Sequence, residues 1–114
     1  MISIIFEVFP KRGKMDEYLD IAAEMRPLIE SVEGFISVER FRSISDPNKL
    51  LSISFFENEK AVEKWRKLAG HRRAQSKGRN EIFDDYRIKV LHVIRDYGMN
   101  DRDQAPDDSL SAHK

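Results

Sequence analysis

The stretch that decides the fold is residues 2–10, Ile-Ser-Ile-Ile-Phe-Glu-Val-Phe-Pro. Its bulky residues recur at alternate positions, which is typical of a β-strand. Successive strand residues point to opposite faces, so apolar side chains occupy both faces of this strand: Ile2, Ile4, Phe6 and Val8 on one, Ile5 and Phe9 on the other. Such a strand needs a cover on each face.

Residues 2–97 contain two strand–helix–strand segments of similar length. A period of three and four residues begins at Lys14 and predicts a helix, for which Gly34 is an expected stop signal. The following pattern predicts strands over 35–43 and 49–57 joined by a turn at 45–48, a second helix from Asn58 to about Gly78, and a last strand within 82–97.

Three residues bear on the ends and continuity of the helices. Pro27 predicts a kink or break near Met25–Arg26, because proline lacks the N–H and clashes with the preceding turn. Asn58 is a favourable N-cap for the second helix. Gly70 interrupts the apolar stripe of that helix and predicts a break just before His71.

The order β-α-β-β-α-β predicts an α+β, ferredoxin-like fold, an antiparallel four-stranded sheet with both helices on one face. The other face stays without cover, and a soluble monomer rarely exposes a large contiguous apolar patch. Pairing two such faces would bury on the order of 800 Å² per subunit, a standard interface size. We therefore expect an isologous homodimer, sheet against sheet, that forms a dimeric α/β barrel.

The length and composition of the chain limit its domain count, its partners and its location. The chain has 114 residues, enough for one domain, over 1–97, and a polar, acidic C-terminal tail over 98–114. Lys+Arg and Asp+Glu both number 20, so the zero net charge disfavours nucleic acid as a partner. No apolar run could span a membrane, no signal peptide is recognisable, and there is no cysteine, so we expect a cytoplasmic protein.

The segments 34–41, 45–47, 56–65 and 71–75 resemble the antibiotic biosynthesis monooxygenase family. The best-marked feature is a strand, an acidic turn, then AxxxW ending at Trp65 and HRxAQ beginning at His71. The resemblance implies a ferredoxin-like fold assembled into dimeric α/β barrels. The family includes cofactor-independent oxygenases of polycyclic phenols, haem-degrading enzymes and members with no known activity.

The family's site residues match this sequence unevenly. In the quinone-forming oxygenases an asparagine, a tryptophan and a tyrosine stand where this chain has Ala61, Trp65 and His71. In the haem-degrading branch a strand asparagine and a haem-ligating histidine stand where this chain has Phe6 and Gln75. The resemblance therefore implies no cofactor, with haem possible but not favoured.

The candidate catalytic residues are Trp65 and His71, and each has a structural reading beside the functional one. Trp65 is either a core side chain or a cavity wall for a flat substrate. His71 is either an exposed residue at a helix end or a general base, because imidazole titrates near neutrality. Neighbouring cations, Arg72 among them, would disfavour its protonated form. The three histidines lack the spacing of a metal site.

The candidate substrate-binding residues are mostly aromatic and could equally belong to the core: Phe6, Phe41, Phe56, Tyr86, His92 and Arg72. His92 shares its strand face with apolar residues, so it is either a satisfied core histidine or a pocket residue. Arg72 belongs to a basic cluster that is either a solvated helix end or a guide for an anionic or phenolate substrate.

Three functions stay open at this point. The first is a cofactor-independent monooxygenase that oxidises a small aromatic or phenolic compound between the sheet and the helices. The second is a small-molecule-binding or stress-response protein of the same fold without catalysis, which the loss of the amide at Ala61 favours. The third is a haem-binding or haem-degrading protein.

Overall fold

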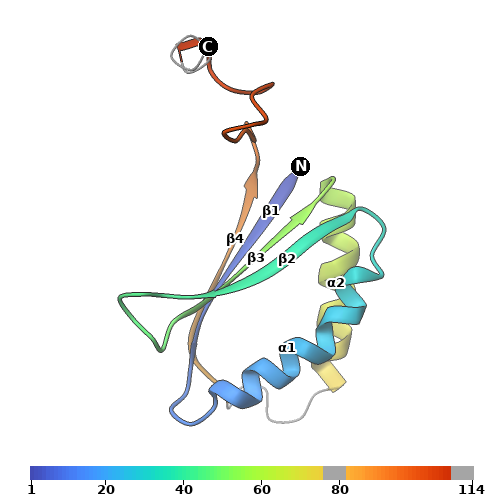
Figure 1. Cartoon of the computed structure of the whole chain (residues 1–114). Helices are drawn as coiled ribbons and strands as arrows, with labels where there is room; N and C mark the ends of the chain where they lie inside the picture. Colours follow the sequence, from blue (N-terminus) through green and yellow to red (C-terminus); the bar gives the residue numbers. More distant parts are fainter. Residues whose placement is uncertain (76–81, 109–114) are drawn as a thin grey trace.

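The computed structural model describes residues 1–75 and 82–108, and of residues 71–75 it describes the backbone alone. The elements follow in the expected order: β1 (Ile2–Pro10), α1 (Met15–Glu30), β2 (Phe35–Arg42), β3 (Leu50–Phe56), α2 (Glu59–Gln75) and β4 (Phe83–His92). The strands form one antiparallel sheet in the order β2-β3-β1-β4. Both helices lie on one side of it, which confirms the ferredoxin-like α+β fold (Figure 1).

Turn and cap chemistry act where the sequence predicted. In the β2–β3 turn the Asp46 carboxylate accepts a hydrogen bond from the Asn48 N–H, at 3.1 Å. The Asp46 carbonyl accepts another from the Lys49 N–H, at 2.9 Å. The Asn58 side chain accepts a hydrogen bond from the Ala61 N–H, at 2.9 Å, and so caps α2. Local side-chain bonds therefore close the hairpin and begin the second helix.

Three local expectations are wrong. No break occurs at Pro27, because α1 runs unbroken to Glu30 and the Pro27 carbonyl still accepts the Ser31 N–H. Gly70 does not interrupt α2, which continues to Gln75, since one glycine costs a helix only about 1 kcal/mol. The last strand ends at His92 rather than near residue 97, because its partner β1 begins at Ile2, opposite His92.

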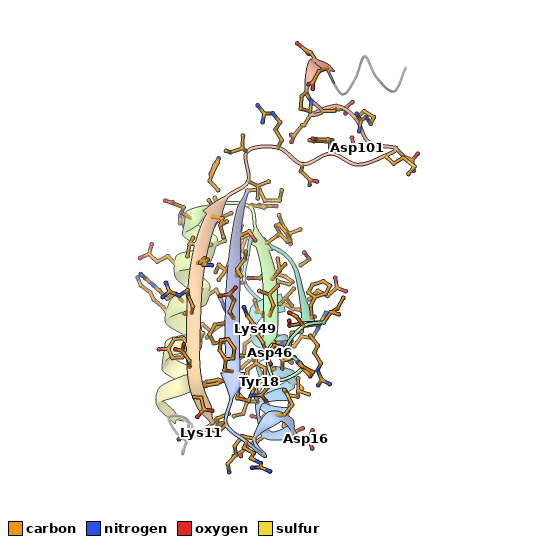
Figure 2. The ribbon with its side chains drawn as sticks, turned by 90° about the vertical axis from the view of Figure 1, so that its left-hand side faces the viewer. Lys11, Asp16, Tyr18, Asp46, Lys49 and Asp101 are labelled. Carbon is orange, nitrogen blue, oxygen red and sulfur yellow. The ribbon has the colours of Figure 1, made fainter. Side chains whose placement is uncertain are left out.

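The core lies between the sheet and the helices in two clusters. One cluster packs α1 and α2 against β2 and β3, through Ile29, Val38 and Ala61. It centres on Phe56, which is fully buried. The other joins the N-terminal half of α1 to the far end of the sheet through Val8, Tyr18, Leu50 and Ile82. Figure 2 shows Tyr18 on α1, behind the sheet in that view. Between the two clusters the packing leaves a cavity.

The face of the sheet away from the helices is called the outer face here. The strand register places on it the apolar side chains Ile5, Phe9, Phe41, Leu51, Ile53, Phe55 and Leu91. Glu7 lies among them, and its carboxylate is 3.7 Å from the Lys49 ammonium and 3.9 Å from that of Lys89. The outer face is therefore largely apolar, with Glu7 paired and with Glu39, opposite Ile53, as a second carboxylate.

The C-terminal segment extends beyond the end of the sheet, as the position of Asp101 shows (Figure 2). Two local hydrogen bonds fold it back on itself: the Gln104 side chain accepts the Asp96 N–H, and the Asp101 carbonyl accepts the Gly98 N–H. Arg102 donates to the Gly98 carbonyl and lies over the Tyr97 ring. No helix among the described residues is long and apolar enough to cross a membrane.

Candidate active site

A cavity of about 580 Å³ lies between the sheet and the two helices. The floor is formed by alternate residues of all four strands, among them Ile4, Phe6, Val38, Arg40, Ser52 and Ile88. The roof comes from α1 and α2, and Ile82 and Phe83 close one end. Strand alternation explains the floor: even-numbered strand residues face the helices and odd-numbered ones form the outer face, except at the register shifts, where Phe35 and Phe83 face the helices.

Trp65 belongs both to the core and to the cavity wall. It is half-buried on α2, packs against the cluster around Phe56 and lines the cavity. Its two readings are therefore compatible. The indole offers a large flat surface to anything bound between sheet and helices, and an N–H donor at its edge.

Aromatic rings form the wall nearest β4. Phe6 contacts Tyr86 edge-on, with ring centroids 5.7 Å apart, and Phe83 at 6.2 Å. Tyr18 of α1 contacts Phe83 in the same manner at 5.6 Å. Edge-to-face pairs hold aromatic rings in defined orientations, so this wall of the cavity is apolar and well ordered.

The opposite side of the floor is polar. Arg40 on β2 pairs in register with Ser52 on β3, which pairs with Phe6 on β1. The Arg40 Nε is buried and has no hydrogen-bond partner among the described residues. Ser54 also lines this side, and its hydroxyl donates to the Ile4 carbonyl at 3.5 Å. The floor thus passes from polar under β2 and β3 to apolar under β1 and β4.

The rim of the cavity carries both charged and apolar exposed residues. Glu24, Arg26 and Arg66 reach it from the helices, and Arg26 is already paired with Glu30 at 2.8 Å. On the β4 side Ile88 remains 47% exposed. Elsewhere on α2 the pKa of Glu63 is lowered by a hydrogen bond from Lys67 and by its charge, on an exposed surface that does not line the cavity.

The structure separates the residues predicted to bind substrate. Phe6 lines the cavity, as does the candidate catalytic residue Trp65. Phe41 lies on the outer face, 45% exposed, because its odd number places it opposite Val38 and Arg40. Phe56 is fully buried in the core, with its ring centroid 5.9 Å from that of Phe35. Neither of the last two residues lines the cavity.

Two further candidates lie on β4. Tyr86 is more than half exposed, does not line the cavity and contacts two residues that do, Phe6 and Phe83, through its ring. His92 is exposed at the end of the strand, opposite Ile2, and does not line the cavity. His71 and Arg72 lie in the last two turns of α2, and their side chains lie outside the described residues.

Sequence reasoning missed Arg40 as a site residue, along with Ser52 and Phe83. The available signal was strand alternation, since Arg40 stands two residues after Val38 and so shares its face of the strand. Parity alone does not tell which face of β2 meets the helices, because both faces of this sheet are partly apolar. Only the register with β1 and β3 places Arg40 beneath the cavity.

The fold and the cavity define a class: ferredoxin-like α+β domains that enclose a small-molecule-sized space between the sheet and its helices. Within this class the chain belongs to the antibiotic biosynthesis monooxygenase family, whose model matches residues 1–77. A relative in the fungus Pyricularia oryzae, named jasmonate monooxygenase ABM, is 39% identical over 101 residues. That match covers 89% of this chain but spans only 47% of the relative's length.

Solved structures support the fold. SnoaB from Streptomyces nogalater, a cofactor-independent oxygenase, superposes with a TM-score of 0.70 at 10% identity, over 83% of this chain and 94% of its own. MhuD, solved with two manganese protoporphyrin IX molecules per active site, gives 0.71 at 15% identity, over 86% and 99%. At such identities the likeness establishes the architecture alone.

Proposed function

We propose that this protein is a cofactor-independent monooxygenase that oxidises a small aromatic or phenolic compound in the cavity beside Trp65. The observation that carries the proposal is the cavity itself, about 580 Å³ in volume and walled by Trp65 and the aromatic rings around Phe6. Its size falls within the range usual for small-molecule sites. Membership of a monooxygenase family and the names of two similar proteins support the reaction class.

The chemistry assigned to the protein is positioning, desolvation and proton transfer. A ring packed against Trp65 is held away from water, which strengthens electrostatic effects on it. His71 acts as the general base that takes the phenolic proton. The resulting phenolate is electron-rich and supplies the electrons: a ring C–H carbon becomes C=O and the phenolate C–O becomes the second C=O of a quinone, while O₂ is reduced, one oxygen entering the product and the other leaving as water with the two hydrogens lost by the phenol. The balance needs no external reductant.

Haem does not enter the proposed reaction. The described residues that line the cavity include no histidine, and no described group of His, Cys, Asp or Glu side chains could hold a metal ion. The position that aligns with the haem-ligating histidine of the family is Gln75, whose side chain lies outside the described residues. The described residues thus offer no fit for an iron ligand of that kind.

The proposed working unit is a homodimer closed through the outer face. Apolar side chains of all four strands project there, and Phe41 and Leu91 remain 45% and 40% exposed in the single chain. Glu7 lies between Lys49 and Lys89, so its carboxylate would be buried with partners, whereas Glu39, opposite Ile53, lies on the edge strand β2 of the same face. The resulting dimer would be the α/β barrel that the sequence predicts, with one cavity on the helix side of each sheet.

An oxygen electrode tests the activity. Wild-type protein, His71→Ala and His92→Ala are each supplied with anthrone-like and quinol substrates. We expect uptake by the wild type, a loss of about 10²–10⁴-fold for His71→Ala, as for removal of a general base, and near wild-type rates for His92→Ala. His92 is the matched control because it does not line the cavity. No uptake across the panel would instead favour a binding protein without catalysis.

A further inference from the structure

The side chain of Arg40 lines the floor of the cavity. The Arg40 Nε is buried, and no described residue accepts a hydrogen bond from it. Buried donors in native proteins are nearly always satisfied by protein or by ordered water, so each exception needs an explanation. For a charged donor in a cavity wall, one explanation is that a bound ligand supplies the acceptor.

The sheet row of Arg40 offers no carboxylate to pair with the guanidinium. Across the sheet the row reads Arg40, Ser52, Phe6 and Ile88, from β2 to β4. It contains no carboxylate. The ion pairs of the sheet, Glu7 with Lys49 and Lys89, lie on the outer face instead. The guanidinium therefore stands at one corner of an otherwise mainly apolar space, beside the Ser52 hydroxyl.

The spacing of the strands along this row indicates how long a bound ligand can be. Neighbouring strands lie about 4.8 Å apart, so Arg40 and Phe6 are separated by about 10 Å, and Arg40 and Ile88 by about 14 Å. A ligand held at Arg40 would extend its remaining atoms over Phe6 and beneath Trp65. The floor therefore fits a molecule with a charged end and an apolar body of one or two rings.

A carboxylate is a better partner for the Arg40 guanidinium than a phenolate is. Guanidinium presents parallel N–H donors that match the two oxygens of a carboxylate, whereas a phenolate offers one oxygen. A carboxylic acid is also fully ionised at neutral pH, whereas an unperturbed phenol, like the tyrosine side chain with its pKa of about 10, is not. The rim arginines are poorer anchors, because Arg66 is exposed and Arg26 is paired with Glu30.

We infer that Arg40 is the anchor for a carboxylate on the ligand, so that the cavity selects lipophilic carboxylic acids whose ring lies between Phe6 and Trp65. This inference deepens the proposed function and rests on it for the reaction. It rests on the geometry of the cavity alone for binding. Arg40 then sets specificity and orientation, while oxidation takes place at the apolar end.

Calorimetry without oxygen tests the anchor separately from turnover. The probes are two matched pairs: jasmonate with its methyl ester, and 1-naphthylacetate with its methyl ester. The proteins are wild type, Arg40→Met and Arg66→Met, two variants that lose the same charge from the floor and from the rim. Arg40→Gln serves as the second floor variant if Arg40→Met does not fold.

We expect the wild type and Arg66→Met to bind each acid at least about tenfold more tightly than its ester, as for a hydrogen-bonded charge pair. The ratio should fall to near one in Arg40→Met. Ligand-free Arg40→Met should also melt at a higher temperature than wild type, because it removes an unsatisfied buried donor, whereas Arg66→Met should not.

Equal affinities for acid and ester in the wild type, or no binding of either acid, would overturn the inference. So would an unchanged acid preference in Arg40→Met. If the proposed oxygenase activity is wrong, the outcome differs. No substrate then causes oxygen uptake, while the preference for the acid and its dependence on Arg40 persist.

Discussion

Gly34 and Ala61 meet so closely that a Cβ added to Gly34 would lie 2.8 Å from the Cβ of Ala61. Gly34 also has φ +93°, a conformation that other residues rarely adopt. The contact joins the loop before β2 to the first turn of α2, and Ala61 is only 2% exposed. It explains why each position has a small residue.

The first prediction follows from this contact. Gly34→Ala should lower the free energy of unfolding by about 2 kcal/mol or more, since backbone strain and the clash add together. Gly70→Ala is the helical control, because nothing lies within 4 Å of its added Cβ. It should raise the free energy of unfolding by about 0.5–1 kcal/mol. Denaturant titration measures both, and a Gly34→Ala variant as stable as wild type would contradict the packing described.

The second prediction concerns the missing amide at Ala61. Ala61→Asn restores the residue type of the quinone-forming oxygenases but should not raise oxygen uptake, because Ala61 is buried against Gly34 and does not line the cavity. Overpacking should cost about 1–3 kcal/mol of stability. Ala61→Ser adds less volume and should cost less. A stable Asn variant with faster uptake would show that this position does reach the substrate.

The third prediction uses the single tryptophan of the chain. Trp65 lines the cavity, so binding of an aromatic ligand should change the intensity and wavelength of the protein's fluorescence with saturation. The urea-unfolded protein at the same ligand concentrations is the control for absorption by the ligand. A linear, unsaturable change identical to that of the unfolded protein would mean that nothing binds beside Trp65.

The fourth prediction tests the outer face. Ile53→Glu places a second carboxylate directly opposite Glu39 on the outer face and should convert a dimer into a monomer, because burying an unpaired carboxylate is costly. Ile44→Glu is the matched control, since Ile44 is fully exposed in the β2–β3 turn. Light scattering coupled to gel filtration gives the masses. A wild-type monomer at micromolar concentration would exclude the dimeric barrel.

The fifth prediction concerns the segment after the domain. A chain that ends at Tyr97 should unfold with a free energy within about 0.5 kcal/mol of the full chain, because the hydrogen bonds of Gln104 with Asp96, of Asp101 with Gly98 and of Arg102 with Ala105 all lie within residues 96–105. Chemical denaturation of both chains compares them. A large loss of stability would place part of the segment in the domain or against a second subunit.

The fold could be predicted from the sequence because its signals are local. Alternation marks the strands, and Asp46 and Asn58 provide the turn and cap bonds that the structure shows. The candidate site could be predicted only in part. Trp65 and Phe6 line the cavity, but Phe41 lies on the other face, because the face that meets the helices is set by long-range strand register. Arg40 was missed for the same reason.

The position of β1 in the middle of the sheet has a consequence for how the chain folds. Ile2–Pro10 must pair on one side with Leu50–Phe56 and on the other with Phe83–His92, so the earliest and latest segments of the domain close against each other. Contacts so distant in sequence form slowly. Until Phe83–His92 has left the ribosome, β1 keeps one open edge, and a nascent chain that stalls there is prone to aggregation.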